Sequence, residues 1–133
     1  MLVSTEAQVF VLTPVNPLNA QDGVNVTFLW DYTANKQLTL AQWGTMTEGN
    51  ILGTIIAQQY GNNDVEYLSS RYNGRALIER RTSLTLVHVK TSDSGRYGCK
   101  LTFEGEQSIM NSTMLIVSGK SLVQMVRQLP SLL

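Results

Sequence analysis

The stretch that decides the fold is TSDSGRYGC, residues 91–99. Its first half is rich in Ser, Asp and Gly, which is typical of a turn. From Tyr97 to Phe103, hydrophobic residues alternate with small or polar ones, so we predict a strand with one face in the core. Tyr97, Cys99, Leu101 and Phe103 would form that buried face.

The spacing of Asp93, Gly95, Tyr97 and Cys99 resembles the turn before strand F, and strand F itself, of a variable-type immunoglobulin domain. The resemblance covers about residues 8–118. It implies an all-β, immunoglobulin-like Greek-key β-sandwich of the V-set type. It also implies that Tyr97 is a tyrosine corner, with its hydroxyl bonded to the backbone upstream.

The chain departs from that family at its first cysteine. Residues 24–32 alternate as a strand with Val26, Phe28 and Trp30 on one side, and the family's core tryptophan is matched by Trp43, thirteen residues after Trp30. Trp30 therefore stands where the family has its first disulfide cysteine. Cys99 is the single cysteine, so no intersheet disulfide forms.

A buried tryptophan offsets part of the loss of a cross-link by the apolar area that it hides. We expect Trp30, Trp43 and Cys99 to meet in the core, with Cys99 an inert buried thiol. The resemblance further implies a structural ion pair between Arg75 and Asp93.

Further alternating runs predict the remaining strands. A short strand or loop at residues 65–70, between the runs at 53–60 and 76–79, favours a variable-type over a constant-type sandwich. The predicted ranges are 9–13, 38–46, 53–60, 65–70, 76–79, 83–89 and 109–117.

The chain of 133 residues is predicted to hold one domain, residues 1–118. Residues 119–133 are predicted to be a linker or a short helical tail, since hydrophobic residues fall there near helical spacing.

Ten basic and ten acidic residues balance, which argues against nucleic acid or an anionic membrane surface as partner. One cysteine and one histidine exclude multi-cysteine and His-pair metal sites. His88 is interpreted as a surface or half-buried strand residue, and no enzyme motif is present. We expect no catalysis, no cofactor, no metal and no small-molecule substrate.

No stretch approaches the ~20 apolar residues that span a bilayer. The resemblance implies the extracellular side of the plasma membrane or secretion, with any membrane attachment through a segment outside this sequence. Two N-glycosylation sequons begin at Asn25 and Asn111 and are meaningful only in that setting. Asn25 is predicted to point outward, so a glycan there would obstruct its sheet.

The opposite sheet face would then stay free for binding. It would be made of the strands at 109–117, 97–103, 38–46 and 53–60, lettered G, F, C and C′ in immunoglobulin domains, and we call it the GFCC′ face. Glycines leave its centre flat, Met and Tyr suit an interface core, and charges are few. Its predicted binding residues are Leu40, Gln42, Gly44, Met46, Ile56, Gln58, Tyr60, Gly98, Lys100 and Thr102.

The leading hypothesis is a module of a cell-surface recognition or adhesion receptor that binds an identical domain, as in adhesion molecules or invertebrate allorecognition receptors. The alternative is a heterophilic immune receptor or ligand domain that binds another protein through the same face or the adjoining loops. A third is a structural module without a binding role. The zero net charge permits two copies to approach.

Overall fold

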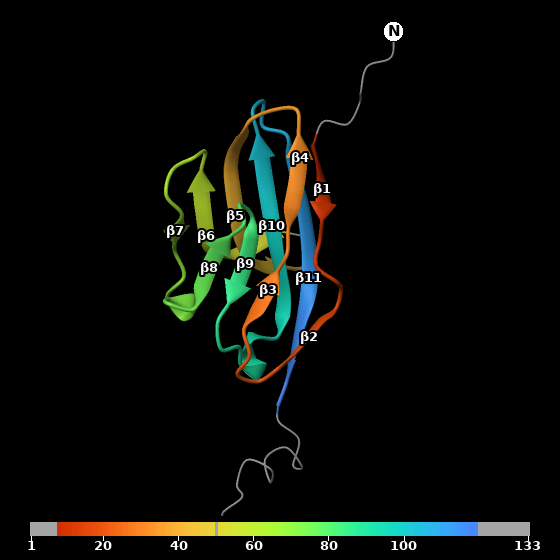
Figure 1. The fold of residues 1–133 in the computed structure, drawn as a ribbon, viewed down its shortest axis with the longest axis vertical. Helices are drawn as coiled ribbons and strands as arrows, with labels where there is room; N and C mark the ends of the chain where they lie inside the picture. The colour runs from red at the N-terminus through yellow and green to blue at the C-terminus, as the bar shows by residue number, and fades with distance from the viewer. Residues whose placement is uncertain (1–7, 50, 120–133) are drawn as a thin grey trace, which may run out of the picture.

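In the computed structural model, residues 8–49 and 51–119 are described, and they form two packed layers of β-strands (Figure 1). The predicted all-β sandwich is confirmed. The predicted tail lies almost entirely outside the described residues.

One layer is a continuous sheet of six strands in the order β2-β11-β10-β5-β6-β7. Strand β2 pairs in parallel with β11, and the other neighbours are antiparallel. The strands span Leu18–Gln21 (β2), Ser108–Ser118 (β11), Gly95–Phe103 (β10), Leu38–Thr47 (β5), Ile51–Tyr60 (β6) and Glu66–Tyr67 (β7). The short β7 confirms the extra strand predicted within residues 65–70.

The other layer is divided. Strand β1 (Gln8–Leu12) pairs with β4 (Asp31–Ala34), whereas β3 (Val26–Phe28) pairs with β9 (Ser83–Leu86), which pairs with β8 (Ala76–Glu79). The single strand predicted over residues 24–32 is therefore wrong, because Leu29 and Trp30 lie between two strands with different neighbours. The predicted alternation still holds, since Val26, Phe28 and Trp30 are all buried.

Side chains close the gap where this layer divides. The Trp30 carbonyl accepts hydrogen bonds from the hydroxyls of Thr82 at 2.7 Å and Ser83 at 3.3 Å. The Trp43 indole donates to the Thr82 carbonyl at 2.9 Å. Farther along, Arg81 forms an ion pair with Asp31 at 2.5 Å. The bonds to the Trp30 and Thr82 carbonyls satisfy backbone groups that a regular strand ladder would otherwise pair.

The core between the layers contains the three predicted residues Trp30, Trp43 and Cys99, each without solvent exposure. Trp43 and Cys99 are direct neighbours across β5 and β10. Trp30 stacks on Phe28, with ring centroids 5.5 Å apart. Burial raises the pKa of the Cys99 thiol well above its usual value, which suits the predicted inert side chain.

Trp30 does more than fill the site of the missing cysteine. Its indole nitrogen donates to the Asn111 amide oxygen on β11 at 2.8 Å. A hydrogen bond thus joins the divided layer to the continuous sheet.

The turn ahead of β10 contains the 3₁₀ helix η2 (Thr91–Asp93). The Tyr97 hydroxyl donates to the Asp93 carbonyl at 2.6 Å, which is the bond expected of a tyrosine corner. The Asp93 carboxylate is 2% exposed and lies 2.5 Å from the Arg75 guanidinium. It also accepts a bond from the Lys90 backbone amide at 2.8 Å. The predicted ion pair joins the start of β8 to this turn.

Candidate protein-binding face

The outward surface of β11, β10, β5 and β6 is the GFCC′ face. Its centre is a row of paired residues that crosses the strands: Gln58 lies beside Gln42, Gln42 beside Lys100, and Lys100 beside Met110. At the edge, Glu66 on β7 accepts a hydrogen bond from the Gln58 amide at 3.2 Å. The row therefore has a carboxylate at one end and uncharged amides in the middle.

Lys100 is the one cation in this row. Within the described part of the chain it forms no hydrogen bond and no ion pair. It is half-buried by its neighbours. Its ammonium group is therefore available to a partner.

A second row lies toward the end of the sheet where β5 begins. Leu40 pairs with Tyr60 on one side and with Thr102 on the other. Tyr60 is exposed, while Leu40 and Thr102 are half-buried. This row offers an aromatic ring beside an aliphatic side chain, a combination that is frequent in interface cores.

The two predicted face glycines are closely packed against neighbouring groups. Gly98 and Gly44 are paired across β10 and β5, and both are buried. A Cβ on Gly98 would meet the Met46 sulfur, so Met46 covers this glycine. A Cβ on Gly44 would meet the backbone carbonyl of Thr54, where β6 bulges toward β5. Gly44 is thus required by close backbone approach.

The prediction that Ile56 belongs to the face is wrong. Ile56 is 1% exposed and belongs to the core, and so does the adjacent Ala57. The register shift between Trp43 and Gly44 lets two consecutive β6 residues be buried, which simple alternation does not predict.

The strand β11 adds face residues that the sequence reasoning did not assign. Met110, Ser112 and Met114 alternate outward opposite Lys100, Gly98 and Arg96. Met46, Met110, Asn111 and Ser112 line a hollow of about 420 Å³. The sequence could have indicated these residues, because every second residue from Ser108 to Ile116 points to the same face of a strand.

The sequon residues lie in different settings. Asn25 is exposed just before β3, and its side-chain oxygen accepts a bond from the His88 backbone amide at 3.0 Å. Asn111 is half-buried in the middle of β11 and is bound to Trp30. Thr113, the third residue of that sequon, is buried and donates to the Val15 carbonyl at 2.6 Å.

Metal-binding clusters and membrane-spanning helices are both lacking in the described residues. Among residues 8–49 and 51–119, no group of three His, Cys, Asp or Glu side chains is placed to hold a metal ion. In the same part of the chain, no helix is long and apolar enough to cross a membrane.

Solved structures with the same fold come from several animals. The two tandem V-type regions of VCBP3, a v-region-containing chitin binding protein, match with a TM-score of 0.71 and 18% identity, over 86% of this chain and 47% of that one. Murine CEACAM1b matches with a TM-score of 0.65 and 21% identity, over 77% and 51%. The V domain of amphioxus IgVJ-C2 matches with a TM-score of 0.62 and 18% identity, over 75% and 98%.

At these identities the likeness shows the fold alone. No curated protein matches the sequence. The family model for the immunoglobulin V-set domain matches residues 13–118, which is most of the chain. Together with the tyrosine corner and the sandwich, this match shows that the chain belongs to the immunoglobulin V-set family.

Proposed function

We propose that this domain is an ectodomain module of a cell-surface recognition or adhesion receptor, and that it binds a second copy of itself through the GFCC′ face. The observation that carries the proposal is the central row of that face. Uncharged amides occupy its middle, the Lys100 ammonium has no partner in the described chain, and Glu66 stands at the edge. Two copies related by a two-fold axis can bring Lys100 of each toward Glu66 of the other.

Two further features support this proposal. The chain has no net charge, so long-range repulsion does not oppose the approach of two copies. The exposed Asn25 lies on the divided layer, and a glycan there leaves the GFCC′ face open. Asn111 is a poorer site for glycan attachment, because its side-chain amide oxygen accepts the hydrogen bond from Trp30. Both the glycan and the extracellular location belong to the proposal.

The test is aggregation of beads or cells that display residues 1–133. Lys100→Glu places like charges opposite one another and is expected to abolish aggregation. The double variant Lys100→Glu/Glu66→Lys restores opposite charges and is expected to recover it. Aggregation that is equal for all three proteins would contradict binding through this row.

A heterophilic receptor or ligand domain is the second candidate, and one observation favours it. Of the ten exposed large hydrophobic residues in the described chain, only Tyr60 and Ile116 belong to β5, β6, β10 or β11. The others include Val11 on β1 and Leu77 on β8, both on the divided layer. In the bead assay, the heterophilic candidate predicts no aggregation for either the unchanged chain or the Lys100→Glu variant.

A further inference from the structure

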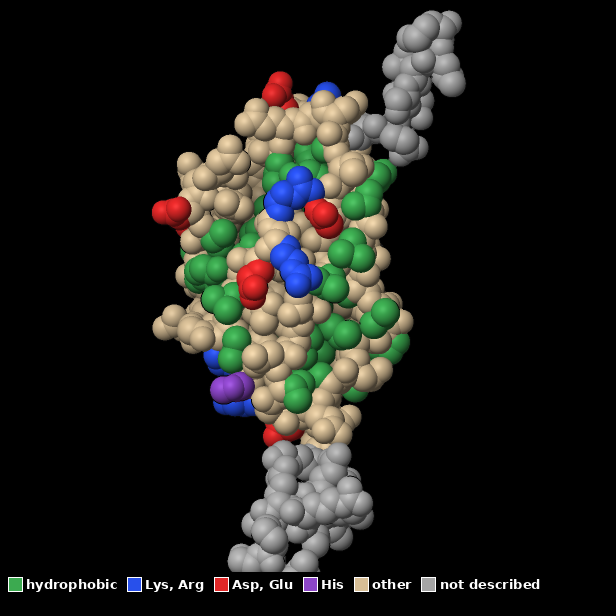
Figure 2. Space-filling model, in the orientation of Figure 1, with side chains coloured by type: hydrophobic (Ala, Val, Ile, Leu, Met, Phe, Trp, Pro, Cys, Tyr) green, Lys and Arg blue, Asp and Glu red, His purple; other side chains and the backbone are tan. Residues whose placement is uncertain are grey.

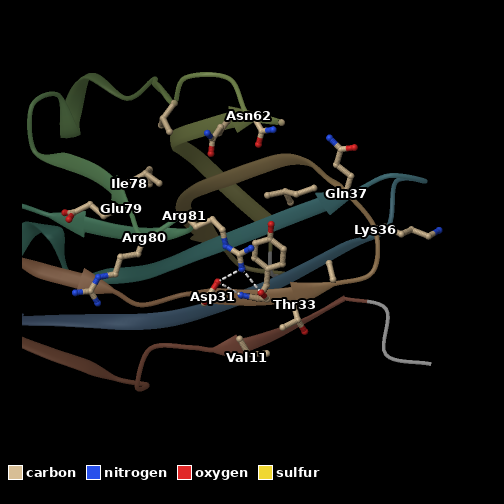
Figure 3. Close-up of a pocket in the computed structure, with 16 residues that line it drawn as sticks. Val11, Asp31, Thr33, Lys36, Gln37, Asn62, Ile78, Glu79, Arg80 and Arg81 are labelled. Carbon is tan, nitrogen blue, oxygen red and sulfur yellow. Dashed lines mark hydrogen bonds and ion pairs between the residues drawn. The ribbon is translucent and has the colours of Figure 1, made fainter. Parts of the chain in front are cut away.

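A second candidate site lies outside the GFCC′ face, at the end of the sandwich where the divided layer opens. A hollow of about 950 Å³ is bounded by β4, the start of β5, the turn after β6, and the turn between β8 and β9 (Figure 3). It exists because β4 pairs with β1 and so leaves β9, while β8 stays with β9. Figure 2 shows basic and acidic side chains gathered on this side of the molecule, with hydrophobic side chains on either side of them.

Arg81 is the central group of the hollow (Figure 3). Its guanidinium lies 3.9 Å from the centre of the Tyr32 ring. Its Nη2 atom donates to the Asp31 carboxylate at 2.5 Å and to the Tyr32 carbonyl at 2.6 Å. The Nε and Nη1 atoms have no partner in the described chain, so three of the five N–H donors remain open.

The backbone holds Arg81 in an unusual conformation. Arg80 and Arg81 have φ angles of 48° and 73°, in the left-handed region that favours glycine. Arginine occupies both positions of this turn, although Gly or Asn would adopt the conformation more readily. Such backbone strain is found where a side chain must be aimed at a particular place.

Other groups around the hollow complement Arg81. The Tyr32 hydroxyl and the Asn62 amide line it, and neither has a hydrogen-bond partner in the described chain. Leu38, Val65 and Ile78 supply a partly buried apolar wall. Asp31 is already neutralised by Arg81, whose hydrogen bond lowers the pKa of that carboxyl below its usual value.

We propose that this hollow binds an acidic side chain of a protein partner, with its carboxylate accepting a hydrogen bond from an open N–H group of Arg81 and its methylene stem against the apolar wall. Both edges through which a guanidinium makes two parallel bonds include Nη2, which Asp31 and Tyr32 already occupy, so the partner's carboxylate accepts a single charge-assisted bond from Nε or Nη1. The Tyr32 hydroxyl and the Asn62 side-chain amide are two further donors without a partner, on residues that line the same hollow. This site is separate from the GFCC′ face and does not depend on self-association.

The aromatic ring in the hollow does not suit a sugar ligand. Saccharide sites use an open aromatic face, but Arg81 covers Tyr32. Tyr32 also contacts Phe103 in an edge-on arrangement, with ring centroids 5.5 Å apart. An acidic side chain needs no such open face.

The test is NMR titration of the ¹⁵N-labelled chain with N-acetyl-glutamate-N-methylamide, beside the matched glutamine compound. We expect saturable shifts at the Arg81 Nε–H and the Asn62 side-chain amide with the glutamate compound only. Arg81→Gln is expected to abolish them, whereas Arg80→Gln, on the adjacent residue that points away from Arg81 (Figure 3), is expected to keep them.

A second variant keeps the proposal testable if Arg81→Gln fails to fold. Asp31→Asn removes the competing carboxylate, and we expect it to bind the glutamate compound several-fold more tightly. Equal shifts with both compounds, or no gain in Asp31→Asn, would overturn the proposal. Shifts with 3′-sialyllactose and none with the glutamate compound would overturn the choice of a protein partner.

Discussion

The two layers of this sandwich are built in different ways. In the continuous sheet, backbone hydrogen bonds run across six neighbouring strands. In the divided layer, the strand that begins at Val26 changes neighbours after Phe28, and side chains of Thr82, Ser83 and Arg81 replace part of the ladder. Both layers share one core, whose centre is Trp30 and Trp43.

The difference shows how the fold persists without a cross-link. The family's disulfide would join the two layers near Cys99, and here the large Trp30 side chain and its bond to Asn111 join them instead. The continuous sheet offers a flat surface, whereas the divided layer offers a hollow. Changes at the junction should therefore cost much more stability than changes in the outer turns.

The largest effect is expected for Trp30→Ala. The variant removes a side chain that is fully buried and stacked on Phe28, and leaves a cavity between the layers. We expect the free energy of unfolding to fall by about 3–5 kcal/mol. Urea denaturation followed by far-ultraviolet circular dichroism measures it. Trp30→Phe keeps an aromatic ring in the core, so its free energy of unfolding should fall less. A fall of less than ~1 kcal/mol for Trp30→Ala would contradict the central place of this side chain in the core.

Asp93→Asn is expected to be next. The change removes the charge that Arg75 faces at 2.5 Å and leaves that largely buried guanidinium with only its bonds to two backbone carbonyls, at 3.3 and 3.4 Å. A charge-assisted bond of this kind contributes about 1.5–3 kcal/mol. Glu79→Gln is the matched control, since Glu79 is exposed and forms no ion pair in the described chain. Equal melting temperatures for the two variants would refute the structural role of Asp93.

The same pair predicts a pH dependence. Burial disfavours the charged Asp93, but the bonds from Arg75 and from the Lys90 amide and the charges of Arg75 and Arg71 outweigh it, so the pKa lies below the ordinary 3.8. A depressed folded-state pKa stabilises the fold above the unfolded value. This contribution is complete at neutral pH and is lost as pH falls below about 4 and through the folded-state pKa. Melting temperatures of wild type and Asp93→Asn should converge there; a constant difference would contradict this linkage.

Thr82→Val tests the side-chain bonds at the junction. The Thr82 hydroxyl, 1% exposed, donates to the Trp30 carbonyl, which Ser83 reaches only at 3.3 Å. We expect a loss of about 1 kcal/mol in chemical denaturation. Thr33→Val on β4 is the control, because Thr33 is exposed and its hydroxyl has no partner in the described chain. Equal free energies of unfolding for the two variants would mean that the divided layer does not depend on the bond from Thr82 to Trp30.

The smallest effect is expected for Arg80→Asn, which should raise the stability of the fold where the other variants lower it. Arg80 has a φ of 48°, and asparagine tolerates the left-handed region better than arginine. The free energy of unfolding of this variant should rise by about 0.5 kcal/mol. Differential scanning calorimetry measures the melting temperatures of Arg80→Asn and of the control Lys36→Asn. Because both variants lose one positive charge, the difference between them reports the backbone effect. A lower melting temperature for Arg80→Asn than for Lys36→Asn would contradict the strain.

Much of the fold could be predicted because its signals are local. The turn before Tyr97 and the alternation through Phe103 predicted β10 and its buried face, and the family pattern predicted the bond from Tyr97 and the pair of Arg75 with Asp93. The fully buried Trp30 follows from alternation as well.

The rest depends on pairing between distant strands. Alternation cannot show that the strand beginning at Val26 exchanges partners, or that a bulge beside Gly44 buries Ile56. The bond from Trp30 to Asn111 joins residues 81 apart in the sequence. The hollow around Arg81 forms because β4 pairs with β1 and not with β9, so no local sequence pattern predicts it.

The most direct test of self-association through the continuous sheet is sedimentation equilibrium of the purified domain across micromolar concentrations, with two variants. Gly98→Arg inserts a long cation into the GFCC′ face, where the Met46 side chain must move aside for the new Cβ. Leu77→Arg inserts the same side chain on exposed β8 of the divided layer. Gly44→Arg is unsuitable, because the Thr54 backbone blocks it. Self-association through the GFCC′ face predicts a weak dimer for wild type and Leu77→Arg and a monomer for Gly98→Arg. A dimer that survives Gly98→Arg and is lost in Leu77→Arg would contradict it and move the interface to the divided layer.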